Sequence, residues 1–240
     1  MSPRMAGQLS FPALWHDTVA DTRALMPLAL PVTAAFVLLP GVAIDLFGPP
    51  LPKTIAAMTP HVILIELILP ALIALVAQGT VVRVALDRRR GRSRLVGEAL
   101  IASLRAWPLL VAAVMLSAVP IGLGLLAVIL PGIYIAGRLT PVVPLVLDGR
   151  GPLAAVEESW AMTAGNGWRV IAFILLFSGW FVVLSAAGAI IGAGAATMFA
   201  AVGAGGAGAA IASTVNGLVA ALFAVVNAVA VATVYRQLTA

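Results

Sequence analysis

Residues 170–235 read VIAFILLFSGWFVVLSAAGAIIGAGAATMFAAVGAGGAGAAIASTVNGLVAALFAVVNAVAVATVY and contain no Asp, Glu, Lys or Arg. A helix rises about 1.5 Å per residue, so a hydrocarbon core of about 30 Å needs roughly 20 apolar residues. This stretch is too long for one crossing and suits two, with the turn expected in the Gly/Ala-rich residues 192–208. We therefore predict two membrane spans, at about residues 169–192 and 209–235.

The composition of the whole chain is also that of a membrane protein. Of its 240 residues, 62% are hydrophobic and 10% are charged, whereas ordinary globular chains are about 45–50% apolar and about 25% charged. These values exclude a water-soluble enzyme, a disordered chain and a nucleic-acid-binding domain, although the net charge is +5. The absence of cysteine excludes a disulfide framework and a thiolate metal site. The predicted fold class is therefore all-α integral membrane.

Four further apolar runs precede residue 170, at about residues 24–46, 61–84, 106–130 and 132–148. The first three are long enough to cross a bilayer. The fourth is shorter and carries Arg138, Pro141 and Pro144, so it either spans the membrane or enters it and returns. The sequence thus predicts one membrane domain with six transmembrane helices arranged as three hairpins.

The distribution of basic residues predicts the orientation of these spans. Lys and Arg accumulate in the cytoplasmic loops of membrane proteins. Lys53 alone lies on one side of the predicted spans. The other side carries Arg4, Arg23, Arg88, Arg89, Arg90, Arg92, Arg94, Arg105, Arg150, Arg169 and Arg236. We therefore predict a multi-pass protein of the bacterial inner membrane with both termini in the cytoplasm, and a first span that is retained because no small-residue cleavage site closely follows it.

Each predicted hairpin follows a short stretch that is amphipathic at helical spacing, at about residues 10–22, 94–105 and 152–164. In the third stretch, for example, Val156 and Trp160 oppose Glu157 and Glu158. Helices of this kind lie in the membrane interface with their apolar face in the acyl region. The sequence therefore predicts three copies of an interfacial helix followed by a hairpin. The alternative is that these stretches are ordinary loops near the membrane, which are often amphipathic.

A set of residues between 130 and 170 resembles a known family. The set comprises Leu130-Pro131-Gly132-Ile133-Tyr134, Arg138-Leu139, Gly151-Pro152-Leu153, Ser159-Trp160, Thr163, Gly165-Asn166 and Trp168-Arg169. It is similar to the membrane-domain family of glycerophosphoryl diester phosphodiesterases, which includes stand-alone six-span bacterial inner-membrane proteins. The resemblance implies a six-helix membrane fold and, in some members, fusion to a phosphodiesterase domain.

The catalytic His-Arg-Gly motif of that phosphodiesterase domain has no counterpart here. His16 is followed by Asp17, and His61 is followed by Val62. The segments between the predicted spans are also too short to hold a catalytic barrel. We therefore predict a protein that is not an enzyme and has no catalytic residue, no cofactor and no metal.

Glu66 and Arg138 are the candidate site residues inside the membrane. Ionisable groups within a bilayer are costly and usually find a partner in the protein interior. Glu66 lies about six residues from the outer end of its span and Arg138 about seven from the Pro131-Gly132 turn, so at about 1.5 Å per residue both lie roughly 9–10 Å deep. We therefore expect an ion pair, either as a packing element or as a gate or binding site for a charged headgroup or ion.

Two further groups of residues are candidates for lipid or helix contacts. Arg88, Arg89, Arg90, Arg92 and Arg94 are expected either to bind anionic lipid headgroups or only to hold their loop in the cytoplasm. Asn216 and Asn227 are eleven residues apart and share one face of the last span, where they either join helices or line a polar pathway.

The function predicted from these features is non-catalytic, in envelope or lipid homeostasis or as a scaffold for a partner. The expected partners are membrane lipids, with a protein partner or a homo-oligomer held through the Gly/Ala-rich helix faces, and no nucleic acid. The alternative is a transporter or channel for a small molecule, an ion or a lipid, which would require a water-filled cavity and broken helices.

Overall fold

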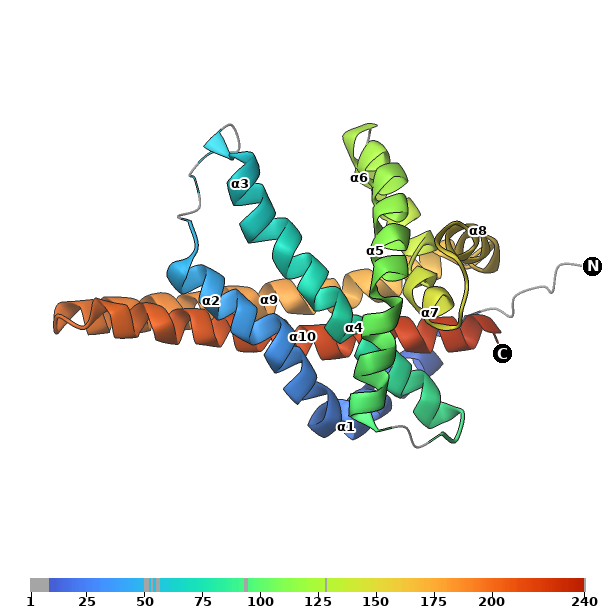
Figure 1. Ribbon diagram of the computed structural model, residues 1–240, viewed down its shortest axis with the longest axis horizontal. Helices are drawn as coiled ribbons and strands as arrows, with labels where there is room; N and C mark the ends of the chain where they lie inside the picture. Colours follow the sequence, from blue (N-terminus) through green and yellow to red (C-terminus); the bar gives the residue numbers. More distant parts are fainter. Residues whose placement is uncertain are drawn as a thin grey trace, which may run out of the picture.

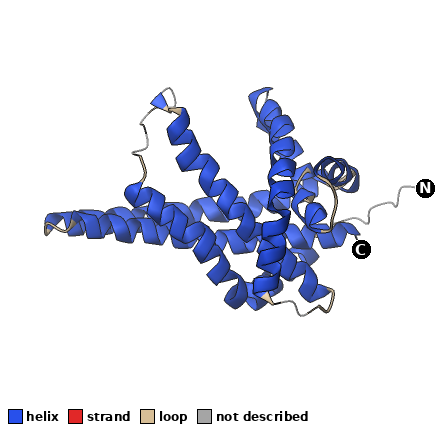
Figure 2. Cartoon of the chain, in the orientation of Figure 1, coloured by secondary structure: helices blue, strands red, loops and turns tan. Residues whose placement is uncertain are grey.

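The computed structural model describes residues 9–49, 52, 54, 57–92, 95–127 and 129–239. Over these residues the chain consists of helices and short connections, without a β-strand (Figure 2). Six helical stretches are long and apolar enough to cross a membrane, which confirms an all-α polytopic membrane fold. They run over Phe11–Phe47, Pro60–Arg89, Val96–Ala127, Ile129–Leu147, Gly167–Ala201 and Gly205–Thr239.

Both helices of the first hairpin contain a short π-helical segment. The first helix consists of α1 (Phe11–Thr33), η1 (Ala34–Leu38) and α2 (Leu39–Phe47). The second consists of α3 (Pro60–Ile63), η3 (Leu64–Ile68) and α4 (Leu69–Arg89). In each helix the π segment ends just before a Leu-Pro pair, at Pro40 and Pro70. Proline has no N–H to donate, so one backbone hydrogen bond of the helix is missing at each of these positions.

The second hairpin pairs one long helix with a broken one. Helix α5 (Val96–Ala127) packs along α6 (Ile129–Arg138), and a side chain on Gly124 would bring its Cβ within 2.8 Å of the Gly132 Cα. The chain then turns at residues 139–141 before α7 (Val142–Leu147), whose six residues are all buried. The fourth predicted span is therefore two helical pieces, with Pro141 in the break.

The third hairpin is longer than the sequence predicts. It consists of α9 (Gly167–Ala201) and α10 (Gly205–Thr239), with a turn confined to residues 202–204 where Gly203 has a φ of 78°. The turn predicted over 192–208 is thus too wide. The glycines there allow the two helices to touch, since a Cβ on Gly208 would lie 2.7 Å from the Ala196 Cα.

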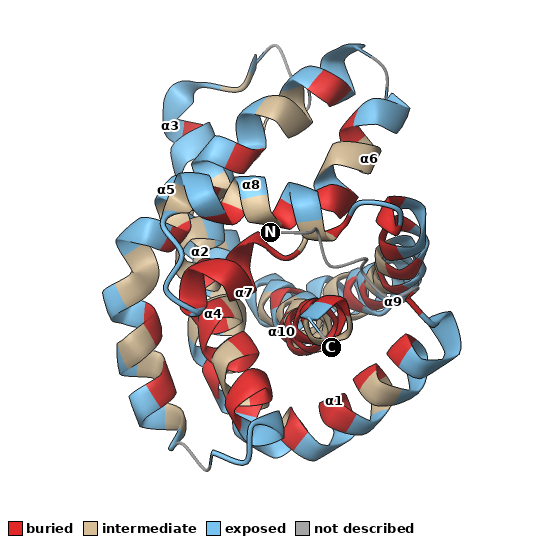
Figure 3. Cartoon of the chain, turned by 90° about the vertical axis from the view of Figure 1, so that its right-hand side faces the viewer, coloured by how far each residue is buried: buried red, intermediate tan, exposed pale blue. Residues whose placement is uncertain are grey.

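Only one of the three expected amphipathic segments is a separate helix. Helix α8 (Pro152–Met162) ends before Gly165, which has a φ of 78°, a left-handed conformation that ends the helix. Residues 11–22 and 96–105 of the other two segments are instead the first parts of the long helices α1 and α5, because no such turn residue follows them. In Figure 3, which looks along α9 and α10, α1 passes crosswise beneath them.

The hairpins are joined at one end; at the other, α3 and the tip of the α5–α6 hairpin stand away from α9 and α10, while η1 and α2 still pack on α10 (Figure 1). The largest buried cluster combines residues of α1, α4, α5, α7 and α10, among them Leu25, Val82, Leu110, Leu145 and Val229. Large apolar side chains elsewhere are exposed, as expected for a surface that faces lipid. Examples are Leu126, Val182, Ile190 and Met198.

Candidate functional site

Arg138, the last residue of α6, is buried, with 8% of its surface exposed. Its Nε donates a hydrogen bond to Thr163 Oγ1 at 2.8 Å and its Nη1 donates to the Tyr134 hydroxyl at 3.0 Å. Its Nη2 donates to the Trp160 carbonyl, and the guanidinium lies over the Trp160 ring, 4.2 Å from the centroid. All of these acceptors are uncharged, so the buried positive charge is held by dipoles and an aromatic face.

The residues around Arg138 are largely those that carry the family resemblance. The Ser159 hydroxyl donates to the Arg138 carbonyl at 2.9 Å, and a Cβ on Gly167 would lie 2.9 Å from the Arg138 Cδ. The Tyr134 ring contacts the rings of Trp160 and Trp168. The spacing of this motif therefore follows from packing α8 and the start of α9 around one guanidinium.

The expected ion pair between Glu66 and Arg138 is wrong. Glu66 lies in η3 of the first hairpin, where a Cβ on Gly48 would come within 3.0 Å of its Oε1. Arg138 is bonded instead to α8 and its own helix, and α6 packs on α5 and α9. Equal depth in the membrane does not decide which helices are neighbours, and the first hairpin is not the neighbour of α6.

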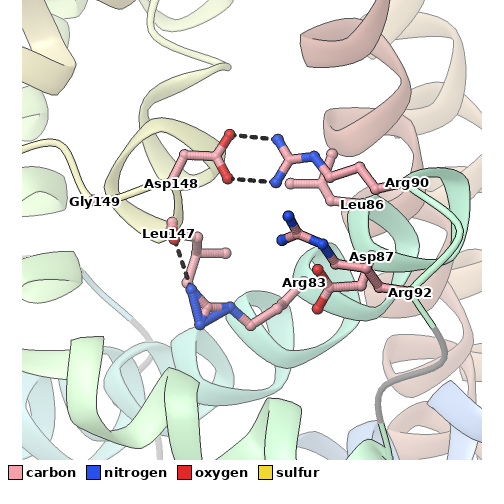
Figure 4. A pocket seen from close by; sticks show the side chains of 8 residues that line it. All are labelled: Arg83, Leu86, Asp87, Arg90, Arg92, Leu147, Asp148 and Gly149. Atoms are coloured by element: carbon pink, nitrogen blue, oxygen red, sulfur yellow. Dashed lines mark hydrogen bonds and ion pairs between the residues drawn. The ribbon is translucent and has the colours of Figure 1, made fainter.

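A polar cavity of about 360 Å³ lies between the ends of α4 and α7 (Figure 4). Its lining comprises Arg83, Leu86, Asp87, Arg90, Arg92, Leu147, Asp148 and Gly149. Arg90 donates two hydrogen bonds to the Asp148 carboxylate, at 2.9 and 2.7 Å. Arg83 donates to the Leu147 carbonyl at 2.6 Å and so satisfies an acceptor that the end of α7 leaves without a helical partner.

Asp148 is the central charged group of this cavity, because the Tyr235 hydroxyl also donates to it, at 2.8 Å. Burial by itself raises the pKa of the Asp148 carboxyl, but hydrogen bonds from Arg90 and Tyr235 outweigh it, so that pKa is below its ordinary value. The bond to Asp148 in turn raises the pKa of Arg90. Both groups are therefore ionised at neutral pH, and the bridge is a charged one.

The described members of the predicted arginine run are all exposed, and they differ in whether they form an ion pair. Arg89 and Arg236 both bind the Asp21 carboxylate, at 2.8 and 2.7 Å, and so tie α1, α4 and α10 together. Arg88 is exposed and donates to the Ala24 carbonyl at 3.3 Å. Arg92 is exposed and makes no side-chain hydrogen bond or ion pair within the described residues.

Arg94, also expected to contact anionic lipid, lies outside the described residues. Of the two asparagines of the last span, Asn216 is exposed and Asn227 is half-buried, and neither forms a side-chain hydrogen bond among the described residues. Asn216 faces α9, with its Oδ1 3.2 Å from the position of a Cβ on Gly188. Asn216 therefore packs where two backbones approach closely, while the structure assigns no polar partner to Asn227 in the described part of the chain.

Arg83, Asp148 and Tyr235 are not among the site residues predicted from the sequence. A signal was present, since Arg83 and Asp148 both lie at the inner ends of apolar runs, where opposite charges at one depth can meet. Over the residues that the structure describes, no group of three or more His, Asp or Glu side chains is placed to hold a metal ion.

Comparisons with protein-family models, with curated proteins and with solved structures found no match to this chain.

Proposed function

We propose that this multi-pass protein resides in the bacterial inner membrane with both termini in the cytoplasm, and that it is not an enzyme. In this proposal it acts in envelope or lipid homeostasis by binding anionic lipid headgroups at its cytoplasmic surface. The observation that carries the proposal is the concentration of arginines at the joined end of the hairpins, where Arg88 and Arg92 remain exposed. The resemblance of residues 130–170 to stand-alone membrane-domain proteins supports it.

The physical basis is electrostatic attraction to the anionic lipids of the inner leaflet. A Lys or Arg near such a surface contributes about 1 kcal/mol. Arg23 and Arg88 lie next to each other through the Arg88 bond to Ala24, and both are exposed. Two such residues give about 2 kcal/mol, which corresponds to roughly 30-fold preference for an anionic over a zwitterionic headgroup.

The test is native mass spectrometry of the protein released from nanodiscs that contain equal amounts of phosphatidylglycerol and phosphatidylcholine. We expect the wild type to retain phosphatidylglycerol preferentially, and Arg23→Gln/Arg88→Gln to lose much of that preference. The control is Arg150→Gln/Glu158→Gln, which removes an exposed ion pair of 2.7 Å and leaves the net charge unchanged. Equal retention of the two lipids by the wild type would contradict the proposal.

Transport is a second candidate function, favoured by the break between α6 and α7. Discontinuous membrane helices are typical of transporter binding sites, and this break follows directly on the buried Arg138. The chain contains no cysteine, so Thr140→Cys places a single thiol at the break. Rapid labelling of this thiol by a membrane-impermeant maleimide would favour a water-filled pathway, whereas protection of the thiol would count against transport.

A further inference from the structure

The cavity between α4 and α7 differs from the surface around Arg23 and Arg88 because its basic groups converge. Arg83 and Arg90 are seven residues apart on α4 and its end, which is about two helical turns, so they share one face. In Figure 4 the side chains of Arg90 and Arg92 extend from the end of α4 toward α7, and that of Arg83 extends to Leu147. Three guanidinium groups thus surround one space.

The charges in this space do not cancel. Asp148 is paired with Arg90, and Asp87, the other carboxylate of the lining, also has an interaction partner. The Arg83 Nη2 donates one hydrogen bond to the Leu147 carbonyl. Arg92 has no partner among the described residues, so three arginines face two aspartates and the lining carries one excess positive charge.

The geometry points to a binding site for one phosphate group in this cavity, with Arg92 as its principal ligand and Arg83 and Arg90 beside it. Guanidinium groups bind phosphate oxygens with paired, directional hydrogen bonds. The volume of about 360 Å³ is within the range of small-molecule sites, about 300–1,000 Å³. The phosphate is either that of an anionic phospholipid or a free phosphate ion, and the lipid source rests on the function proposed above.

The experiment uses the purified full-length protein in mild detergent and two probes. Dioleoyl phosphatidylglycerol is titrated and its first bound molecule is measured by native mass spectrometry, while inorganic phosphate is titrated by isothermal calorimetry. We expect Arg92→Gln to weaken binding of the first phosphate-bearing ligand at least tenfold. Arg105→Gln removes the same charge from an exposed position outside the cavity, and we expect less than a twofold effect.

A second variant tests the site by an expected increase in affinity for the probe rather than a decrease. Asp148→Asn removes the carboxylate that neutralises Arg90, so we expect tighter binding of the same probe. Glu158→Gln is the control, since it releases Arg150 from a comparable ion pair outside the cavity lining and should leave binding unchanged.

The outcomes distinguish a failure of the proposed cavity site from a failure of the proposed lipid-binding function. Stoichiometric binding of phosphatidylglycerol that depends on Arg92 identifies a lipid headgroup, and Arg92-dependent binding of inorganic phosphate alone identifies the free ion. Equal losses in Arg92→Gln and Arg105→Gln would overturn the cavity site while leaving a general preference for anionic lipid intact. If the wild type does not distinguish phosphatidylglycerol from phosphatidylcholine, the lipid function fails, and the inorganic phosphate titration still decides the cavity.

Discussion

Replacing Arg138 with alanine should destabilise the protein by about 3 kcal/mol. Arg138 makes three hydrogen bonds to neutral acceptors, and bonds from a charged donor are worth about 1.5 kcal/mol each at the low end, or about 4.5 kcal/mol together. Its contact over the Trp160 ring adds about 1–2 kcal/mol. The variant also removes the cost of keeping a guanidinium out of water, about 3 kcal/mol after relaxation. Subtracting this cost from the lost contacts leaves a net destabilisation of about 3 kcal/mol.

The assay is reversible unfolding in detergent with increasing sodium dodecyl sulfate, followed by circular dichroism. Arg138→Lys keeps the charge but not the planar fork of donors, and we expect an intermediate loss. Arg105→Ala serves as the control, because Arg105 is exposed, and surface substitutions usually change stability by less than about 0.5 kcal/mol. If Arg138→Ala were no more destabilising than Arg105→Ala, the reasoning that Arg138 anchors α8 to α6 would be refuted.

Three further substitutions, at Gly208, Asp21 and Asp148, test the stability contributed by particular contacts. Gly208→Ala should cost about 1–3 kcal/mol because its Cβ would meet the Ala196 Cα at 2.7 Å, whereas Gly206→Ala, with nothing within 4 Å, should be tolerated in the same unfolding assay. Asp21→Asn should cost about 1–3 kcal/mol, because Arg89 and Arg236 lose their shared carboxylate, while the Arg89 side chain is 43% exposed and Arg236 keeps its ion pair with Asp17; no change in unfolding would show that these pairs are not stabilising. Because the pKa of Asp148 is lowered in the folded protein, its contribution to stability is complete above its ordinary value of about 4 and is lost as the pH falls further. Thermal unfolding between pH 6 and 3 should therefore show a smaller acid-induced loss for Asp148→Asn than for the wild type.

The number of membrane helices followed from the sequence because hydrophobic length alone determines it. The charge-free residues 170–235 had to form two helices, and the structure has α9 and α10 there. The position of their turn did not follow, because glycine occurs both in turns and in close helix contacts. Gly192 and Gly208 are contact residues, whereas Gly203 makes the turn.

The types of residue in the candidate site were predictable from the sequence, but which of them contact one another was not. Arg138 was recognisable as a costly charge within an apolar run, and the motif around residues 159–168 was recognisable as a pattern. That these belong to one arrangement required the turn that brings α8 back onto the end of α6. Likewise, the bridge from Arg90 to Asp148 depends on α7 ending beside α4, which depth in the membrane does not specify.

The lengths of the helices constrain how the protein lies in a bilayer. Helix α9 has 35 residues and is about 52 Å long, which is longer than a hydrocarbon core of about 30 Å, so it either tilts or extends beyond the core at its ends. Figures 1 and 3 both show α5 standing across the α9–α10 hairpin, so no membrane normal is parallel to both.

The normal must therefore lie between these directions, with the hairpins inclined to opposite sides of it. Of the first hairpin, η1 and α2 also pack along α10, so its position relative to the third hairpin depends on those contacts as well as on the end where all three hairpins meet. There the Asp21 carboxylate joins α4 and α10 to α1, and Asp148 joins the end of α7 to α10 through Tyr235. These charged groups thus add to the apolar cluster that joins the three hairpins, and we expect the loss of Asp21 to loosen the hairpins relative to one another before any single hairpin unfolds.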